Sequence, residues 1–128
     1  MTHRYHSPVF LALVDEARPR VKEIAVADYT GLLMRREHHV LIDVREDHEW
    51  ARGRLPGAMH LGRGIIERDI ESFFADRSMP LVCYCGGGYR SVLVCDSLQK
   101  MGYTNAVSLA GGIRAWQAAG LPIETDQE

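Results

Sequence analysis

The sequence predicts a single α/β domain with a parallel sheet covered by helices on both faces. Continuous apolar runs, typical of strands buried on both sides, alternate with segments of helical periodicity along almost the whole chain. The chain has 128 residues, a common size for one domain. Its composition, 46% hydrophobic and 25% charged, is that of an ordinary globular protein. Disordered, collagen-like and coiled-coil classes are therefore excluded.

In the first half of the chain, a helix is predicted to begin at Ser7-Pro8 and to end near Pro19, with apolar residues at helical spacing. We treat residues 1–21 as an N-terminal helical extension, whose first residues, including His3 and His6, are expected to be mobile. The following segments are a short apolar stretch at 24–26, a helix over 27–36, a buried strand over 40–43, a short polar helix over 46–52 and a brief strand over 58–61.

The second half of the chain continues the alternation of helices and strands. The expected elements are a helix over 65–74, a buried strand over 81–84, a helix over 91–101, a strand over 106–109, a tight turn at Gly111-Gly112 and a helix over 113–119. Gly102 and Gly120 end two of these helices. The domain proper is expected to span residues 22–123, and residues 124–128 to form a flexible tail.

Charge and cysteine content exclude several classes of function. Fifteen Lys and Arg against 17 Asp and Glu leave a net charge of -2, without a chain-wide positive field to attract nucleic acid. The apolar run at Val9–Val14 is too short for a membrane span or a signal peptide. Cys83, Cys85 and Cys95 suit neither a disulfide framework nor a zinc site. We expect a cytoplasmic protein without metal or cofactor.

The segment from Cys85 to Arg90 carries the predicted chemistry. It follows the strand over 81–84, and parallel sheets bind ligands at the carboxyl ends of their strands. The glycines at 86–88 allow successive N–H groups to converge on one point, a nest for an anion that the next helix continues. Amide dipoles, the helix dipole and the Arg90 cation all favour the thiolate form of Cys85. Cys85 is therefore the predicted nucleophile.

Loop length favours sulfur chemistry over phosphate chemistry. Four residues separate Cys85 from Arg90, whereas cysteine-dependent phosphatases place one more residue there to surround a tetrahedral phosphoryl group. A tighter ring fits a single sulfur atom, such as the anionic outer sulfur of a Cys85 persulfide. Cys83 and Cys95 are expected to be core residues, because buried cysteines usually behave as small hydrophobic side chains.

Three segments of the chain resemble the rhodanese-like sulfurtransferases. The first includes Asp43-Val44-Arg45, Glu49-Trp50 and Gly53-Arg54-Leu55-Pro56-Gly57-Ala58; the second is the loop from Cys85 to Arg90 with Ser91; the third includes Leu109-Ala110-Gly111-Gly112-Ile113, Trp116, Gly120 and Pro122. Together they span roughly residues 22–123 in the order usual for that family, which is more specific than any one motif. Only the N-terminal helix lies outside the resemblance.

The resemblance implies a five-stranded parallel sheet in the order 1-5-4-2-3 and Cys85 as the carrier of sulfane sulfur. It implies a ping-pong cycle, in which Cys85 takes sulfur from a small anionic donor such as thiosulfate. The sulfur then passes to cyanide in the test tube, or to a thiol or protein acceptor in the cell. The residues expected to bind substrate are Arg90, Arg63, Gly86, Gly87, Gly88 and Tyr89.

Two further residues of the resemblance are expected to support the site rather than to react. Asp43 ends a strand, where an aspartate commonly caps a turn through backbone N–H groups. Arg45 is expected to pair with a carboxylate such as Glu49 behind the loop.

Two alternatives to a sulfurtransferase remain open at this stage. One is a non-catalytic rhodanese module that senses redox state or binds partners, although the retention of Cys85 and Arg90 argues against it. The other is a phosphatase or arsenate reductase, which the short loop disfavours. For assembly, we expect a monomer or a weak homodimer.

Overall fold

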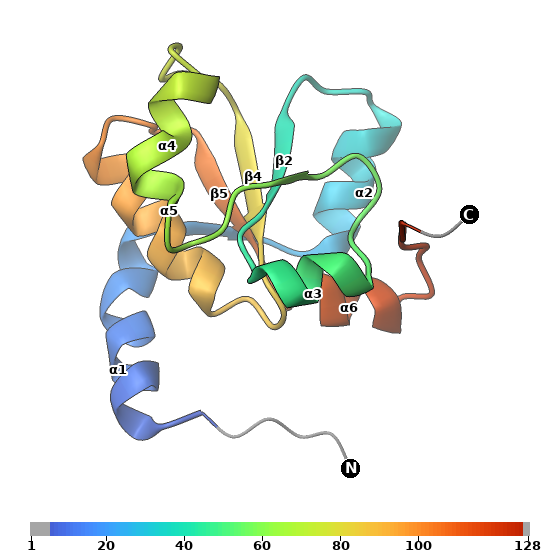
Figure 1. Cartoon of the computed structure of the whole chain (residues 1–128), viewed down its shortest axis with the longest axis horizontal. Coiled ribbons are helices and arrows are strands. Elements are labelled where there is room, and N and C mark those ends of the chain that lie inside the picture. Colours follow the sequence, from blue (N-terminus) through green and yellow to red (C-terminus); the bar gives the residue numbers. More distant parts are fainter. Residues whose placement is uncertain (1–5, 127–128) are drawn as a thin grey trace.

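The computed structural model describes residues 6–126, which form a three-layer α/β fold (Figure 1). The strands are β1 (Lys22–Ile24), β2 (Val40–Asp43), β3 (Met59–His60), β4 (Leu81–Tyr84) and β5 (Ala106–Leu109). The helices are α1 (Pro8–Ala17), α2 (Val26–Met34), α3 (Asp47–Arg52), α4 (Ile66–Phe73), α5 (Arg90–Lys100) and α6 (Gly112–Ala118), with a 3-10 turn at Arg18–Arg20. All strand pairs are parallel and the order is β1-β5-β4-β2-β3, as predicted. None of the described helices has the length and apolar character needed to cross a bilayer.

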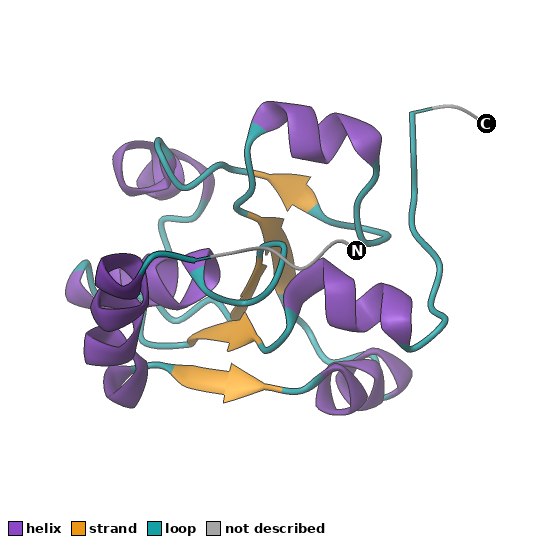
Figure 2. Ribbon diagram, turned by 90° about the horizontal axis from the view of Figure 1, so that it is seen from below, coloured by secondary structure: helices purple, strands orange, loops and turns teal. Residues whose placement is uncertain are grey.

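Helices cover both faces of the sheet, and each face has its own hydrophobic core (Figures 1 and 2). On one face, α1, α4 and α5 pack over the strands, with Val14 and Ile70 fully buried. On the other face, Tyr29 of α2 and Trp116 of α6 are buried. Successive strand residues point to opposite faces, so β4 sends Cys83 to the first core and its neighbours to the second. This two-sided burial explains the continuous apolar runs of the central strands.

The largest boundary difference from the sequence prediction is at the first strand. β1 covers Lys22–Ile24, so the apolar stretch expected at 24–26 overlaps this strand only at Ile24. Ala25 already caps α2, and its N–H donates a hydrogen bond to the Asp28 carboxylate at 3.1 Å. Within residues 6–126, β1 is an edge strand that pairs only with β5; it is partly exposed, so it has no continuous apolar run. The C-terminal end of α2 is at Met34, whereas the sequence predicts a helix that continues to residue 36.

The N-terminal helix is docked on α5. Its predicted cap is present, since the Ser7 hydroxyl accepts a hydrogen bond from the Phe10 N–H at 3.1 Å. Val14 and Ala17 of α1 are buried in the core that α5 shares. Directly after α1, the guanidinium of Arg20 donates to both carboxylate oxygens of Asp96 on α5, at 2.9 and 3.0 Å.

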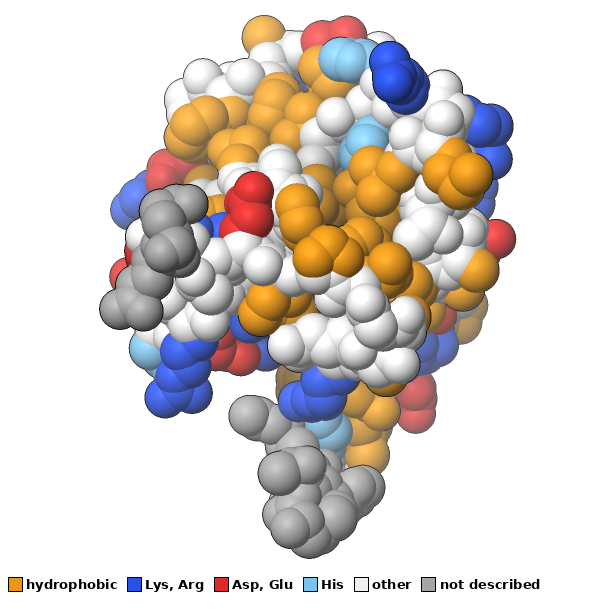
Figure 3. Space-filling model, turned by 90° about the vertical axis from the view of Figure 1, so that its right-hand side faces the viewer, with side chains coloured by type: hydrophobic (Ala, Val, Ile, Leu, Met, Phe, Trp, Pro, Cys, Tyr) orange, Lys and Arg blue, Asp and Glu red, His pale blue; other side chains and the backbone are white. Residues whose placement is uncertain are grey.

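After α6 the chain returns to the residue that follows Gly53. Arg54 and Glu124 exchange two backbone hydrogen bonds at 2.9 and 2.8 Å, and the Arg54 side chain pairs with Asp126 at 2.9 Å. Residues 127–128 of the predicted tail, and His3 in the predicted mobile start, lie outside the described residues. On the side of the molecule that carries α2 and α6, hydrophobic side chains reach the surface (Figure 3); Met34 of α2 is 84% exposed.

Replacing Val14 by Ala should lower the free energy of unfolding by about 1–3 kcal/mol, because this side chain is fully buried in the core that α1 shares with α5. Val9→Ala is the matched control on the same helix. Its side chain is 81% exposed, so the change should stay below about 0.5 kcal/mol. Urea denaturation followed by circular dichroism measures both variants. Equal effects would contradict the docking of α1.

Candidate active site

The loop from Cys85 to Arg90 joins β4 to α5 at the carboxyl end of the sheet, as predicted. Gly88 adopts a φ of 96°, in the region that favours glycine. A Cβ at this position would lie 2.8 Å from the Gly111 nitrogen, so no larger residue fits without displacing the loop that follows β5. The glycine at 88 is therefore required both by conformation and by close approach.

The first turn of α6 holds the other side of this loop. The N–H groups of Ile113 and Arg114 donate to the carbonyls of Cys85 and Gly86, at 2.9 and 3.1 Å. Such N–H groups have no partner within their own helix, so the loop satisfies them. In a trans peptide the N–H points opposite to the C=O, and the N–H groups of Gly86 and Gly87 therefore point away from α6. Gly112 allows this contact, because a Cβ there would overlap the Cys85 carbonyl.

The sulfur of Cys85 lies among hydrogen-bond donors. It accepts from the Gly88 N–H at 3.2 Å and from the Ser91 N–H at 3.4 Å, and it lies 3.5 Å from the Ser91 hydroxyl. The Ser91 hydroxyl is in turn 2.7 Å from the hydroxyl of Ser108 on β5. Cys85, Ser91 and Ser108 are all almost inaccessible to solvent. Of the three glycine N–H groups expected to converge, that of Gly88 donates to the sulfur, and the Ser91 N–H in the first turn of α5 supplies a second donor.

Arg90 is oriented by an ion pair with α3. Its guanidinium donates to both carboxylate oxygens of Glu49, at 2.7 and 3.0 Å. The hydrogen bond from Arg90 lowers the pKa of Glu49 to about 2. The pKa of Arg90 is raised, first by Glu49 and further by the neighbouring Cys85. The predicted pairing of Glu49 with Arg45 is therefore wrong, because the Glu49 carboxylate binds the arginine that follows the glycine loop.

Arg45 instead forms a buried ion pair with Asp43. Its guanidinium donates to both Asp43 oxygens at 2.8 to 3.1 Å, and to the Gly53 carbonyl at 2.6 Å. Asp43 also accepts from the Arg45 N–H at 2.9 Å, the turn cap expected for this residue, and from the Tyr84 hydroxyl at 2.6 Å. Burial, together with the charge of Asp43, raises the pKa of Tyr84. This cluster joins β2, β4 and the end of α3.

Cys85 is one of the residues that line a cavity of about 340 Å³. The lining residues are His6, Ser7, Phe10, Arg63, Cys85, Gly87, Tyr89, Arg90 and Arg114. The structure thus brings four predicted substrate-binding residues, Arg63, Gly87, Tyr89 and Arg90, beside the cysteine. Gly86 and Gly88 shape the loop without lining the cavity.

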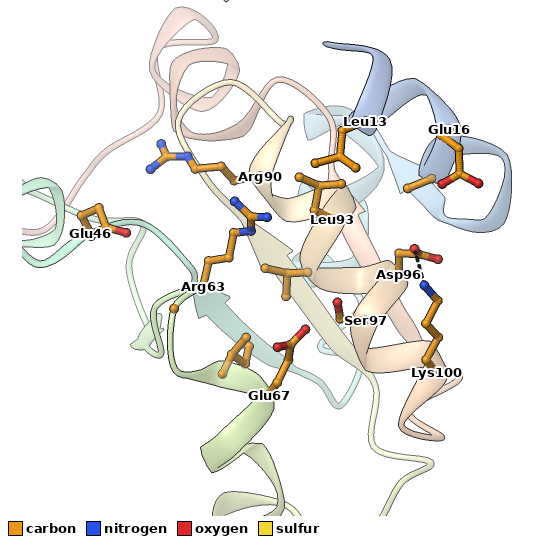
Figure 4. A pocket seen from close by; sticks show the side chains of 14 residues that line it. Leu13, Glu16, Glu46, Arg63, Glu67, Arg90, Leu93, Asp96, Ser97 and Lys100 are labelled. Carbon is orange, nitrogen blue, oxygen red and sulfur yellow. Dashed lines mark ion pairs between the residues drawn. The ribbon is translucent and has the colours of Figure 1, made fainter. Parts of the chain in front are cut away.

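A second cavity, of about 540 Å³, adjoins the first and shares Arg63 and Arg90 with it. It lies between α1, α4 and α5 (Figure 4). Figure 4 shows Arg63 reaching from the turn before α4 toward the start of α5. Leu13 and Leu93 contribute apolar lining on the opposite side. Arg63 therefore stands where the two cavities meet.

Four lining residues were missed by reasoning from the sequence: His6, Ser7, Phe10 and Arg114. Arg114 of α6 lies against the glycine loop, and a Cβ built on Gly87 would come 2.5 Å from its guanidinium. Its position soon after Gly111-Gly112, at the end of the strand next to β4, was a usable signal. His6 was assigned to a mobile start, but its ring packs against that of Tyr89 with centroids 4.7 Å apart.

The arrangement combines a sheltered sulfur nucleophile with cationic side chains. Arg63, Arg90 and Arg114 all line the cavity of Cys85. Cations beside a nucleophile attract an anionic substrate and stabilise negative charge during its reaction. Within residues 6–126, no three His, Cys, Asp or Glu side chains lie close enough together to hold a metal ion. The groups in place suit covalent transfer of a negatively charged group.

Comparison with known proteins identifies the class. The rhodanese-like domain family matches residues 26–119, so the chain belongs to this family. A putative sulfurtransferase of Bacillus subtilis, YtwF, is 36% identical over 102 residues, covering 80% of this chain and 96% of that protein. The thiosulfate sulfurtransferase GlpE of Actinobacillus succinogenes is 34% identical, covering 73% of this chain and 82% of that protein. The chain is thus a sulfurtransferase of the rhodanese type.

A solved structure from Rhodopseudomonas palustris shares the fold over nearly the whole chain. It has a TM-score of 0.83 and 30% sequence identity, and the match covers 97% of this chain and 100% of that one. That protein is described as being of unknown function and a possible tyrosine phosphatase. Phosphatase activity is therefore an alternative that experiments on this chain should test.

Glu49→Gln should make acid stability less dependent on pH. The pKa of Glu49 is about 2 in the folded protein against a usual 4.5, so its ion pair stabilises the fold fully above about pH 5 and is lost as the pH falls toward 2. Because the pair is partly exposed, we expect Glu49→Gln to cost about 1–2 kcal/mol at pH 7, and the difference to shrink toward pH 2. Urea titrations at several pH values measure it; a pH-independent difference would contradict this account.

Proposed function

We propose that this sulfurtransferase moves sulfane sulfur from an anionic donor such as thiosulfate to a thiophilic acceptor, through a persulfide on Cys85. The observation that carries the proposal is the donor ring around Cys85 Sγ: the N–H groups of Gly88 and Ser91 donate to the sulfur, and the Ser91 hydroxyl lies 3.5 Å from it, where it can donate to a thiolate. Such donors stabilise a thiolate before the reaction and again after sulfur leaves. The thiosulfate sulfurtransferase activity in the name of the Actinobacillus relative points to the same donor.

In the first step, the Cys85 thiolate attacks the outer sulfur of thiosulfate. A new S–S bond forms, the bond between the two sulfurs of thiosulfate breaks, and its electron pair leaves with sulfite. Arg63 and Arg114, which line the cavity and form no ion pair within residues 6–126, attract the doubly charged donor into it. The Gly87 N–H donates to no acceptor among the described residues, and Gly87 lines the cavity, so it is available to the transferred sulfur.

In the second step, the acceptor attacks the outer sulfur of the persulfide. Cyanide or a thiolate supplies the electron pair of the new bond, while the electron pair of the broken S–S bond returns to Cys85 as thiolate. The donor ring that stabilised the thiolate at the start does so again, so it favours the departure of Cys85. Asp43 and Arg45 support this site by holding β2, β4 and the end of α3 together.

The proposal also covers the cellular compartment, the assembly and the domain bounds of the enzyme. The three cysteines are unpaired and buried, which suits a reducing cytoplasm. We propose a monomer or weak homodimer, with residues 22–123 as the rhodanese-like domain and residues 1–21 as an extension that contributes to it. Light scattering after gel filtration measures the assembly, and a stable higher oligomer would contradict this part.

Incubation with thiosulfate should add one sulfur to the protein, because the Cys85 thiolate retains the outer sulfur of the donor. Intact-mass spectrometry measures the adduct, cyanide should remove it, and Cys85→Ser should not form it. Cys83→Ser is the control, because Cys83 is buried in β4 and does not line the cavity of Cys85. Absence of the adduct, or its formation in Cys85→Ser, would overturn the proposal. Hydrolysis of p-nitrophenyl phosphate by the wild type would favour the phosphatase instead.

Ser91→Ala should slow the loading of Cys85 by about tenfold or more, since a hydrogen bond to a charged group contributes about 1.5–3 kcal/mol. Ser97→Ala is the matched control on the same helix, where the side chain lines the adjoining cavity instead. Rapid quench with mass detection measures the loading rate. Loading at the wild-type rate in Ser91→Ala would exclude the hydroxyl from the donor ring.

A further inference from the structure

Part of the cavity beside Cys85 is formed by residues outside the family match. Three of its lining residues, His6, Ser7 and Phe10, precede residue 26, where the match begins. The His6 ring lies 4.7 Å from Tyr89 and 5.5 Å from Phe10, and the Phe10 and Tyr89 rings are 6.4 Å apart, all measured between centroids. We call His6, Phe10 and Tyr89 the aromatic wall. It places planar, largely apolar surface beside the reacting sulfur.

The same cavity contains positive charge that the described structure does not neutralise. Arg90 is paired with Glu49. Arg63 and Arg114, by contrast, take part in no ion pair within residues 6–126. The cavity is therefore amphipathic, with an aromatic wall and two cations available to a ligand.

The cavity is large enough to hold an organic ligand as well as a small inorganic anion. A volume of about 340 Å³ lies in the range of pockets that hold organic ligands, roughly 300–1,000 Å³. Thiosulfate and cyanide have no apolar surface to place on aromatic rings. A second substrate with an organic body would use both parts of the cavity.

We propose that the aromatic wall is an acceptor subsite for a small organic thiol that carries carboxylates. Its uncharged body packs against His6, Phe10 and Tyr89, and its carboxylates pair with Arg63 and Arg114. This inference rests on the proposed function, because the acceptor reacts with the Cys85 persulfide. It makes the N-terminal helix part of the substrate-binding surface.

The chemistry of transfer explains why cations are needed here. The acceptor thiolate forms an S–S bond to the outer sulfur, the bond from that sulfur to Cys85 breaks, and the electron pair of the broken bond returns to Cys85 as thiolate. The outer sulfur leaves on the acceptor with its negative charge. Two anions must therefore approach each other, and Arg63 and Arg114 reduce their repulsion in the partly enclosed cavity.

The test uses full-length protein loaded with sulfur from thiosulfate and freed of excess donor. Discharge of the persulfide is followed by intact mass with glutathione, glutathione diethyl ester, 2-mercaptoethanol or cyanide as acceptor. In the wild type, we expect glutathione to react about tenfold more efficiently than its diethyl ester, which lacks free carboxylates. Equal efficiency of the two would overturn the assignment of a carboxylate-bearing acceptor.

Variants of the aromatic wall test the position of the subsite. His6→Ala and Phe10→Ala should each lower the ratio of glutathione to cyanide efficiency by about tenfold, through a higher KM for glutathione. Val9→Ala is the matched control, because Val9 lies beside Phe10 in sequence but is 81% exposed and does not line the cavity. Phe10→Leu, which retains apolar volume, guards against loss of helix docking and should give an intermediate ratio.

The outcomes separate this inference from the proposed function. Failure of thiosulfate to load Cys85 would overturn the function. Normal loading, with a glutathione to cyanide ratio that stays within about twofold of wild type in His6→Ala and Phe10→Ala, would overturn the subsite alone. An equal loss with 2-mercaptoethanol and glutathione would also overturn it, because the smaller thiol has neither carboxylates nor a body that reaches the wall.

Discussion

The site depends on two hydrogen bonds from the first turn of α6 to the carbonyls of Cys85 and Gly86. They satisfy donors that a helix cannot satisfy internally, and they set the direction of the loop peptides. With these carbonyls turned toward α6, the following N–H groups face away from it, and Gly88 returns the chain toward Cys85 Sγ. Glycines at 88 and 112 are needed because the two loops approach more closely than a Cβ allows.

The site combines neutral hydrogen-bonding groups with charged side chains. Next to the sulfur lie the N–H groups of Gly88 and Ser91 and the Ser91 hydroxyl, and Arg90 is close enough for Cys85 to contribute to its raised pKa. The arginines line the surrounding cavity. Glu49 neutralises Arg90 and fixes its orientation, which leaves Arg63 and Arg114 as the cations available to substrate. The buried pair of Asp43 and Arg45 is a separate structural unit with its hydrogen bonds satisfied.

The N-terminal helix is part of the core and also reaches the cavity of Cys85. Val14 is buried, and Arg20 of the following turn binds Asp96, so α1 is attached to α5, the helix that begins at the active-site loop. The start of α1 then brings Phe10 to the cavity of Cys85. α1 therefore extends the hydrophobic core and also forms one side of the cavity beside Cys85.

Much of this protein is determined by its sequence alone. The apolar runs and the glycine punctuation predict the alternating elements, and the loop from Cys85 to Arg90 predicts a sulfur nucleophile, because these signals are local and reflect backbone conformation and burial. The order of the strands followed from resemblance, which the observed sheet confirms. The apolar stretch at 24–26 does not mark the edge strand β1 correctly, because an exposed strand has a weak apolar pattern.

Only the tertiary structure decided which charged side chains meet. Arg45 lies close to both Asp43 and Glu49 in the sequence, yet Glu49 binds Arg90, which is far away along the chain. The packing of α3 beside the loop brings Glu49 to Arg90, and no local sequence pattern predicts this pair. Arg114 and His6 reach the cavity for the same reason, because their positions depend on how α6 and α1 pack around β4. Local patterns specify the elements, whereas long-range packing specifies the partners in the site.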